Sequence, residues 1–178
     1  MINNLNILIP EIFLSLSIFA VLMFGVFIKK SFNIVFNLTS LILILNIAII
    51  LNNPNHEEKI FLDSFTRDAF SNYFKILILI SSLFVLNSSK NFIAENKLDK
   101  FEYPIIILLS ILGMFFMVSA NDLILFYLGL ELQSLSLYIL ASIDRDNLRS
   151  SESGIKYFVL SALSSGLLLY GCSLLYGF

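Results

Sequence analysis

The amino-acid sequence predicts an all-α protein that crosses a membrane six times. Apolar residues make up 58% of the 178 positions and charged residues only 13%, about half the charged fraction of a typical water-soluble domain. The mean hydropathy is +0.89, and several apolar runs are long enough to cross roughly 30 Å of hydrocarbon as helices. So few polar side chains cannot cover a water-soluble globule.

Six apolar segments meet this length requirement, and short polar connections separate them. Lys75 interrupts the third segment, and we expect its ammonium group to extend toward the nearer membrane face, the alternative being a position inside the helix bundle. No repeat and no low-complexity linker divides the sequence, which predicts a single membrane domain over residues 1–178. The predicted helices lie at about 12–28, 31–51, 69–89, 103–120, 123–143 and 154–176.

The composition also excludes several classes of function. One cysteine and one histidine cannot form the ligand cluster of a zinc, iron–sulfur or haem site. The net charge of −2 leaves no basic surface for nucleic acid, and the sequence contains no glycine-rich phosphate loop. We therefore expect no metal or cofactor in this chain and no catalytic chemistry of its own.

Basic residues in the connections predict the orientation in the membrane, because the more positive side faces the compartment in which the protein is made. The less positive side, which we call the outer face, then contains both termini, the loop around His56 and the link at 121–122. The basic residues on the positive side are Lys29, Lys30, Lys90, Lys97, Lys100, Arg145 and Arg149, against Lys59 and Arg67 on the outer face.

Acidic residues mark the predicted starts of three helices. Glu11, Asp68 and Asp122 each lie in or before a first turn, where an acid interacts favourably with the free N–H groups and the helix dipole. We interpret all three as structural. The very short link at 121–122 also makes the fourth and fifth helices antiparallel neighbours.

Glu131 is the ionisable residue that lies deepest in an apolar segment. It follows Leu123 by eight residues, which places it roughly 12 Å into its helix, where a charge costs about 2.5–3.5 kcal/mol unless it faces protein or water. Tyr127, Ser134 and Tyr138 share its helix face, so we expect a polar stripe that can hold water and a proton. The alternative is a neutral glutamic acid that joins two helices by hydrogen bonds.

Two features of the sixth segment are further candidates. Lys156 lies about one turn inside it and either extends to the positive face or takes part in proton transfer; its depth, roughly 6 Å against roughly 18 Å for Glu131, argues against a direct salt bridge. Small residues on the same helix favour close helix packing. The predicted helix-interface residues are Gly154, Ser161, Ser165 and Gly166, with Ala162 and Cys172 near them.

Two long strings carry a resemblance to a known family. The strings "NDLILFYLGLELQSLSLYIL" and "SGIKYFVLSALSSGLLLYGCSLLYGF", supported by "IPEIFL" and "RDAFSNYF", resemble chain 2 of NADH:ubiquinone oxidoreductase, an antiporter-like membrane subunit of respiratory complex I. The resemblance implies a proton-translocating subunit with the helix-five acid, Glu131, on a hydrated charged axis. It places Lys156 near the half-channel from the positive compartment, and assigns no role to Lys75 or Cys172.

The resemblance also implies partners and a location. NADH, FMN, iron–sulfur clusters and ubiquinone are expected in other subunits of the complex, so NADH oxidation belongs to them; lipids and other complex I membrane subunits are the expected neighbours. Members of the family have more helices than the six predicted here, and we expect a separate chain to carry the remainder, a fragment being the alternative. The composition suggests an AT-rich genome and hence the mitochondrial inner membrane, with a bacterial plasma membrane as the alternative.

Two other functions remain open from the sequence. A structural membrane scaffold would use its polar groups only to hold helices together. A subunit of a cation/proton antiporter complex, or a self-contained six-helix transporter, would share the helix-five acid without belonging to complex I. Replacing Glu131 distinguishes the structural scaffold from a proton-transfer subunit, because a scaffold does not need a proton-binding group at this position.

Overall fold

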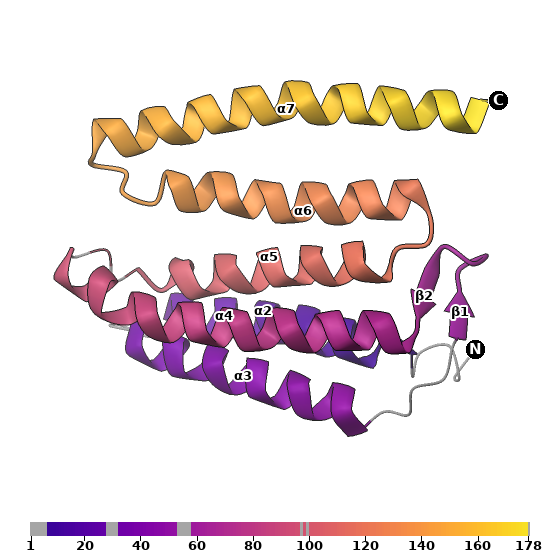
Figure 1. The fold of residues 1–178 in the computed structure, drawn as a ribbon. Coiled ribbons are helices and arrows are strands. Elements are labelled where there is room, and N and C mark those ends of the chain that lie inside the picture. Colours follow the sequence, from indigo (N-terminus) through magenta and orange to yellow (C-terminus); the bar gives the residue numbers. More distant parts are fainter. Residues whose placement is uncertain (1–6, 28–31, 53–57, 97, 99, 178) are drawn as a thin grey trace.

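The computed structural model describes residues 7–27, 32–52, 58–96, 98 and 100–177, and within them it confirms the predicted all-helical membrane fold (Figure 1). Six helices are long and apolar enough to cross a membrane. They are α2 (Ile9–Phe27), α3 (Phe32–Asn52), α4 (Ala69–Glu95), α5 (Glu102–Ser119), α6 (Leu123–Ala141) and α7 (Leu148–Gly177).

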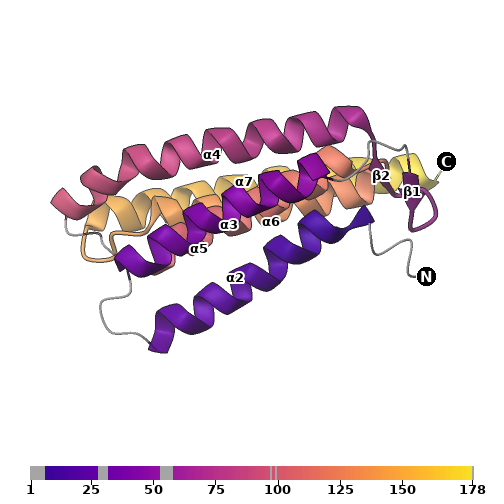
Figure 2. The same cartoon turned by 90° about the horizontal axis from the view of Figure 1, so that it is seen from below.

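Helix α5 lies at the centre of the molecule. It contacts α2, α3, α4 and α6, and 61% of its most apolar window is buried. On one side of α5, helices α6 and α7 follow in a row; on the other, α2, α3 and α4 form a compact group (Figures 1 and 2). The predicted antiparallel pairing of α5 and α6 is confirmed, while none of the α7 window is buried within the described part of the chain.

The helix boundaries differ from the predicted ones where charged residues continue a helix beyond the apolar run. Helix α4 extends to Glu95 and therefore includes Lys90, whose Nζ lies 5.2 Å from the centroid of the Phe36 ring. Helix α7 begins at Leu148, six residues before the predicted start. Hydropathy marks the part of a helix inside the hydrocarbon, whereas the helix itself can continue into the polar region. Lys29, Lys30, Lys97 and the loop around His56 lie outside the described residues.

A small β-hairpin, which the sequence analysis did not predict, covers the end of the bundle that corresponds to the outer face. Strands β1 (Glu58–Ile60) and β2 (Phe65–Arg67) pair in antiparallel register. The hairpin is fastened to the link between α5 and α6: the N–H of Asn121 donates to the carbonyl of Ser64 (2.9 Å), and Phe65 forms an isolated bridge with Ala120. The link between α5 and α6 and the chain segment before α4 therefore form one connected surface.

The capping prediction is confirmed for Asp68 and wrong for Asp122. The Asp68 carboxylate accepts a hydrogen bond from the N–H of Ser71 (2.7 Å), and the Asp68 N–H donates to the Ser71 hydroxyl (3.0 Å), so the two residues form a capping box at the start of α4. Asp122 precedes α6, but its side chain makes no capping hydrogen bond. The side chain that fastens this link is Asn121, which donates to the carbonyl of Asp63 (2.9 Å).

We expect Asp68→Ala to lower the stability of the protein by about 1 kcal/mol, because the half-buried start of α4 loses the acceptor for one of its free N–H groups. The melting temperature of the purified protein measures this loss. Asp68→Asn is the matched control, because asparagine retains the acceptor oxygen and is an equally good N-cap. Equal losses in the two variants would contradict a capping role.

Candidate functional site

The polar stripe of α6 lies on the side of that helix that faces α7. Gly129 and Gln133 face α5 instead: a Cβ built on Gly113 of α5 would lie 2.6 Å from the backbone N of Gln133 and 2.8 Å from the carbonyl O of Gly129. Glu131 lies between these two residues in the sequence, so the helical period directs it away from α5. Tyr138, on the same face as Glu131, packs its ring edge-on against Tyr157 of α7, with 4.8 Å between centroids.

The carboxyl group of Glu131 lacks a hydrogen-bond partner for one of its oxygens. Glu131 is half-buried, and its Oε1 is buried without a hydrogen bond from any described residue. Ser134, one turn further along, donates its hydroxyl to the backbone carbonyl of Glu131 (3.0 Å) rather than to the carboxyl. Tyr127 is also half-buried on this face. A buried polar atom without a partner is costly, and it is a place where water or another polar group binds.

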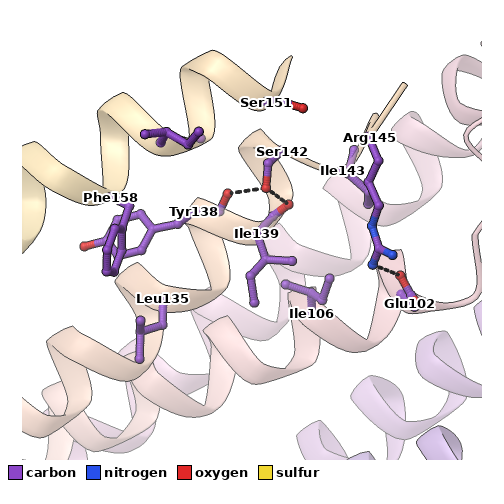
Figure 3. A pocket seen from close by; sticks show the side chains of 12 residues that line it. Glu102, Ile106, Leu135, Tyr138, Ile139, Ser142, Ile143, Arg145, Ser151 and Phe158 are labelled. Atoms are coloured by element: carbon purple, nitrogen blue, oxygen red, sulfur yellow. Dashed lines mark hydrogen bonds and ion pairs between the residues drawn. The ribbon is translucent and has the colours of Figure 1, made fainter. Parts of the chain in front are cut away.

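A cavity of about 540 Å³ opens at the positive end of the molecule, between α5, α6 and α7 (Figure 3). Arg145 and Glu102 lie at one end of it, exposed and paired at 3.4 Å. Leu135, Tyr138 and Phe158 line the other end. Leu135 is one turn from Glu131 along α6, so the cavity extends from the charged connection toward the polar stripe.

The small residues of α7 have different surroundings. Gly154 is buried against α6, and a Cβ at this position would lie 2.6 Å from the Cβ of Ser142. Ser161 and Ser165 are half-buried, whereas a Cβ at Gly166 would meet nothing within 4 Å. Gly154 thus contacts α6, while Gly166 lies on the open side of α7.

Lys156 and Glu131 are not brought together. The ammonium group of Lys156 is 2.6 Å from Oε1 of Glu152, one turn earlier on α7, and both side chains are more than half exposed. An exposed pair of this spacing contributes little to stability. Lys156 therefore lies on the uncovered surface of α7, where it is free to contact other helices.

A second buried charged site was missed by the sequence analysis. The Nζ of Lys75 on α4 lies 2.6 Å from Oε1 of Glu11 on α2, and these side chains are 1% and 3% exposed. The expectation that Lys75 extends to the membrane face is wrong, and Glu11 does more than begin a helix. Both residues lie within two turns of the predicted outer ends of their helices, and this shared depth is the signal that could have revealed the pair.

Comparison with known proteins places these features in a family. Residues 120–178 match the model of the transmembrane region shared by NADH:quinone oxidoreductases and Mrp antiporters. The chain is 55% identical over 177 residues to NADH-quinone oxidoreductase subunit N of Pelagibacter ubique, covering 99% of this chain and 38% of that protein. It is 50% identical over 178 residues to the same subunit of Bartonella bacilliformis, with coverages of 99% and 36%.

The structural comparison agrees. A chain of respiratory complex I from Thermus thermophilus, solved with bound Aureothin, superimposes with a TM-score of 0.79 at 27% identity, over 94% of this chain and 36% of that one. This chain is similar to the N-terminal portion of an antiporter-like membrane subunit of complex I. A chain of the archaeal membrane-bound sulfane sulfur reductase has the same fold, with a TM-score of 0.74 at 20% identity over 96% of this chain and 37% of that one.

The predicted resemblance to complex I membrane subunits and the predicted multi-pass membrane fold are therefore confirmed. The chain spans a little over a third of the length of these complex I relatives. The relatives named here are bacterial proteins, and they do not specify a membrane compartment for this chain. The mitochondrial inner membrane stays a prediction, with the bacterial plasma membrane as its alternative.

Proposed function

We propose that this chain is the first part of a proton-translocating antiporter-like module of complex I, and that Glu131 is a proton-binding group of that module. The observation that carries the proposal is the partnerless Oε1 of Glu131, buried in the middle of a membrane-spanning helix. An ionisable residue in such a place is a functional-site candidate. The similarity to subunit N of NADH-quinone oxidoreductases supports the proton-translocating class.

The cavity at the positive end supplies the approach to Glu131 in this proposal. Water entering between Arg145 and Glu102 reaches Tyr138 and Leu135 inside the cavity. Ser134 and Glu131 follow on the same side of α6. A chain of water along this stripe would pass protons from the positive compartment to the carboxyl group, with Tyr127 continuing the stripe beyond it.

Further helices of the same module complete the site in this proposal. The most apolar window of α7 has no buried residues within the described part of the chain, and Lys156 is exposed on this helix. We assign the missing helices of the longer relatives to this surface, whether they belong to the same polypeptide or to a separate one. Covered in this way, Lys156 would be desolvated and could influence the proton affinity of Glu131 through intervening water.

Redox chemistry lies with other subunits of the assembly in this proposal. NADH, FMN, the iron–sulfur clusters and ubiquinone would bind to those partners. Their redox reactions would be coupled to proton movement in this chain through its contacts with other membrane subunits. The surrounding membrane is either a mitochondrial inner membrane or a bacterial plasma membrane, with both termini of the chain on the outer face. Lipids fill the exposed apolar grooves.

The test is Glu131→Gln in the assembled complex. Glutamine has nearly the same shape but cannot bind and release a proton at neutral pH. We expect several-fold fewer protons translocated per electron, measured with a pH-sensitive dye in proteoliposomes, while the amount of assembled complex is unchanged. The matched control is Glu95→Gln, at the exposed end of α4, which should translocate normally. Normal translocation by assembled Glu131→Gln would contradict the proposal and favour the structural scaffold.

A further inference from the structure

The ion pair between Glu11 and Lys75 lies in the group formed by α2, α3 and α4, apart from the Glu131 site. The two sites lie on opposite sides of the α5–α6 pair: Lys75 lies beside Phe115 of α5, with Nζ 5.8 Å from the ring centroid. Glu131 is on the α6 face that points away from α5. The close backbone contact between Gly113 and Gly129 closes the space between α5 and α6. The ion pair is therefore a separate polar site.

Stability alone does not explain a buried ion pair at this position. Removing two charges from water costs several kcal/mol per ion, and apolar residues of similar volume are often as stable or more stable in the same place. The Nζ of Lys75 contacts Glu11 and lies beside two aromatic rings, Phe65 at 5.4 Å and Phe115 at 5.8 Å from the ring centroids. Such an arrangement inside a membrane-spanning bundle indicates a role for the charges themselves.

Two acceptor oxygens at this site have no partner among the described residues. They are Oε2 of Glu11, the carboxylate oxygen that does not contact Lys75, and Oδ1 of Asn46 on α3. The amide N of Asn46 donates to the carbonyl of Pro10 (3.2 Å), the residue before Glu11, so the Asn46 side chain lies beside the same turn of α2. Asn46 is 0% exposed and Glu11 2%.

A single bound water molecule would satisfy this set of groups. A buried water typically makes about three hydrogen bonds. Here it can donate to Oε2 of Glu11 and to Oδ1 of Asn46, and it can accept one of the two N–H bonds of Lys75 that do not face Glu11. Both donors of the water then meet acceptors that otherwise lack a partner.

The β-hairpin separates this site from the outer face. Phe65 of β2 is 1% exposed and lies over the ammonium group of Lys75. Arg67, at the end of the same strand, is 5% exposed, and its Nε and Nη2 have no hydrogen-bond partner within the described part of the chain. Ser119, at the end of α5, has a buried hydroxyl that is likewise unpartnered. Arg67 and Ser119 thus place further buried polar groups at the outer end of the bundle.

We propose that Glu11, Lys75 and Asn46 form a second protonation site, which binds water and exchanges protons with the outer face. Transfer of one proton from Nζ of Lys75 to the bound water, and of one proton from that water to Oε2 of Glu11, breaks one N–H bond and forms one O–H bond, converting the ion pair to a neutral pair without a change in net charge. Glu11 then releases this proton through the bound water to water at the outer face, and Nζ of Lys75 takes up one proton from the same face, which restores the ion pair. The exchange role rests on the proposed function, namely that this module moves protons; the water site does not.

The water is tested on the unaltered complex. A cryo-electron microscopy map at a resolution that shows ordered water should contain a water within hydrogen-bonding distance of Glu11 Oε2 and Asn46 Oδ1. A map in which these two oxygens bind a protein donor instead, or in which the space between them is empty, would overturn the proposal. This measurement needs no variant and does not depend on Glu131.

The proton role is tested with Glu11→Gln/Lys75→Met, which removes both charges together and leaves an amide that can donate to Asn46. We expect the assembled variant to translocate at least twofold fewer protons per electron. The matched control is Glu95→Gln/Lys90→Met, which makes the same two substitutions at the opposite end of α4, outside both proposed sites, and should translocate normally. Normal translocation in the Glu11/Lys75 variant would overturn the proton role. A defect here combined with normal translocation in Glu131→Gln would refute only the role of Glu131.

Discussion

Lys75→Met is expected to destabilise the protein by about 3–5 kcal/mol and to deplete the assembled complex severalfold. The substitution removes the cation from a buried pair and leaves the Glu11 carboxylate without a counter-charge in a low-dielectric environment. Methionine is close to lysine in length and flexibility, so the change in packed volume is small. Most of the expected loss therefore comes from the unpaired charge, not from a cavity.

The amount of complex in solubilised membranes and its melting temperature measure this effect. Glu11→Gln/Lys75→Met should recover most of the lost stability, because the second substitution removes the unpaired carboxylate. Arg145→Met serves as the control, because Arg145 belongs to an exposed pair whose loss should cost less than about 1 kcal/mol. If Lys75→Met is as stable as the Arg145 variant, Lys75 is not held in the buried pair described here.

Proton translocation by the stabilised double variant Glu11→Gln/Lys75→Met distinguishes a protonation site from a purely structural ion pair. Two residues that only join helices can be replaced together by two compatible neutral residues, and both stability and translocation then return. A protonation site loses its function even when stability returns. The double variant should therefore be stable and yet deficient, and this combination is what a structural role would not produce.

The sequence allowed the helices to be predicted because hydropathy reports directly on membrane insertion. Each apolar run is a property of one segment, so six spans and their order could be derived without any knowledge of contacts. The stripe on α6 could be derived in the same way, because Tyr127, Glu131, Ser134 and Tyr138 follow the helical period of a single helix. All four residues lie within α6, so they share one face of this helix.

Features that involve two segments could not be derived. Lys75 alone has the appearance of a residue that extends to the membrane face, and its partner Glu11 has the appearance of a first-turn acid. Their pairing depends on how α2 and α4 pack around α5, which no single segment encodes. The hairpin was missed for a related reason: each strand has three residues, too few for a periodic pattern.

Helix ends were predicted with less success than helix centres. The start of α7 contains Arg149 and Glu152, whose charges lower the hydropathy of this part of the helix, so the predicted start came six residues too late. Asp122 shows the opposite error, because a favourable residue at an N-cap position makes no capping bond there. Local sequence permits a cap, but the side chain's other neighbours decide whether it forms.

Gly113→Val is expected to separate α5 from α6 and to prevent assembly of the complex. A Cβ at Gly113 would lie 2.6 Å from the backbone N of Gln133 and 2.8 Å from the carbonyl O of Gly129. Backbone atoms of a helix cannot move aside as a side-chain end can, so the two helices must move apart. Forcing extra volume into a packed interface typically costs 1–3 kcal/mol and occasionally more, and here it removes contacts along the whole α5–α6 pair.

The same argument applies from the other helix, which makes the prediction specific. A Cβ at Gly129 would lie 2.8 Å from the backbone N of Met117 and 2.9 Å from the carbonyl O of Gly113, so Gly129→Val should be as severe. Ser81→Val, on the exposed surface of α4, adds a branched side chain without such a contact and should assemble normally. Full assembly of both glycine variants, measured by native gel electrophoresis, would contradict the close α5–α6 contact.

Because α6 carries Glu131 and α5 contacts Lys75, the close α5–α6 contact also fixes the distance between the two charged sites. A variant that assembles with the helices moved apart should therefore alter proton translocation even with both sites intact.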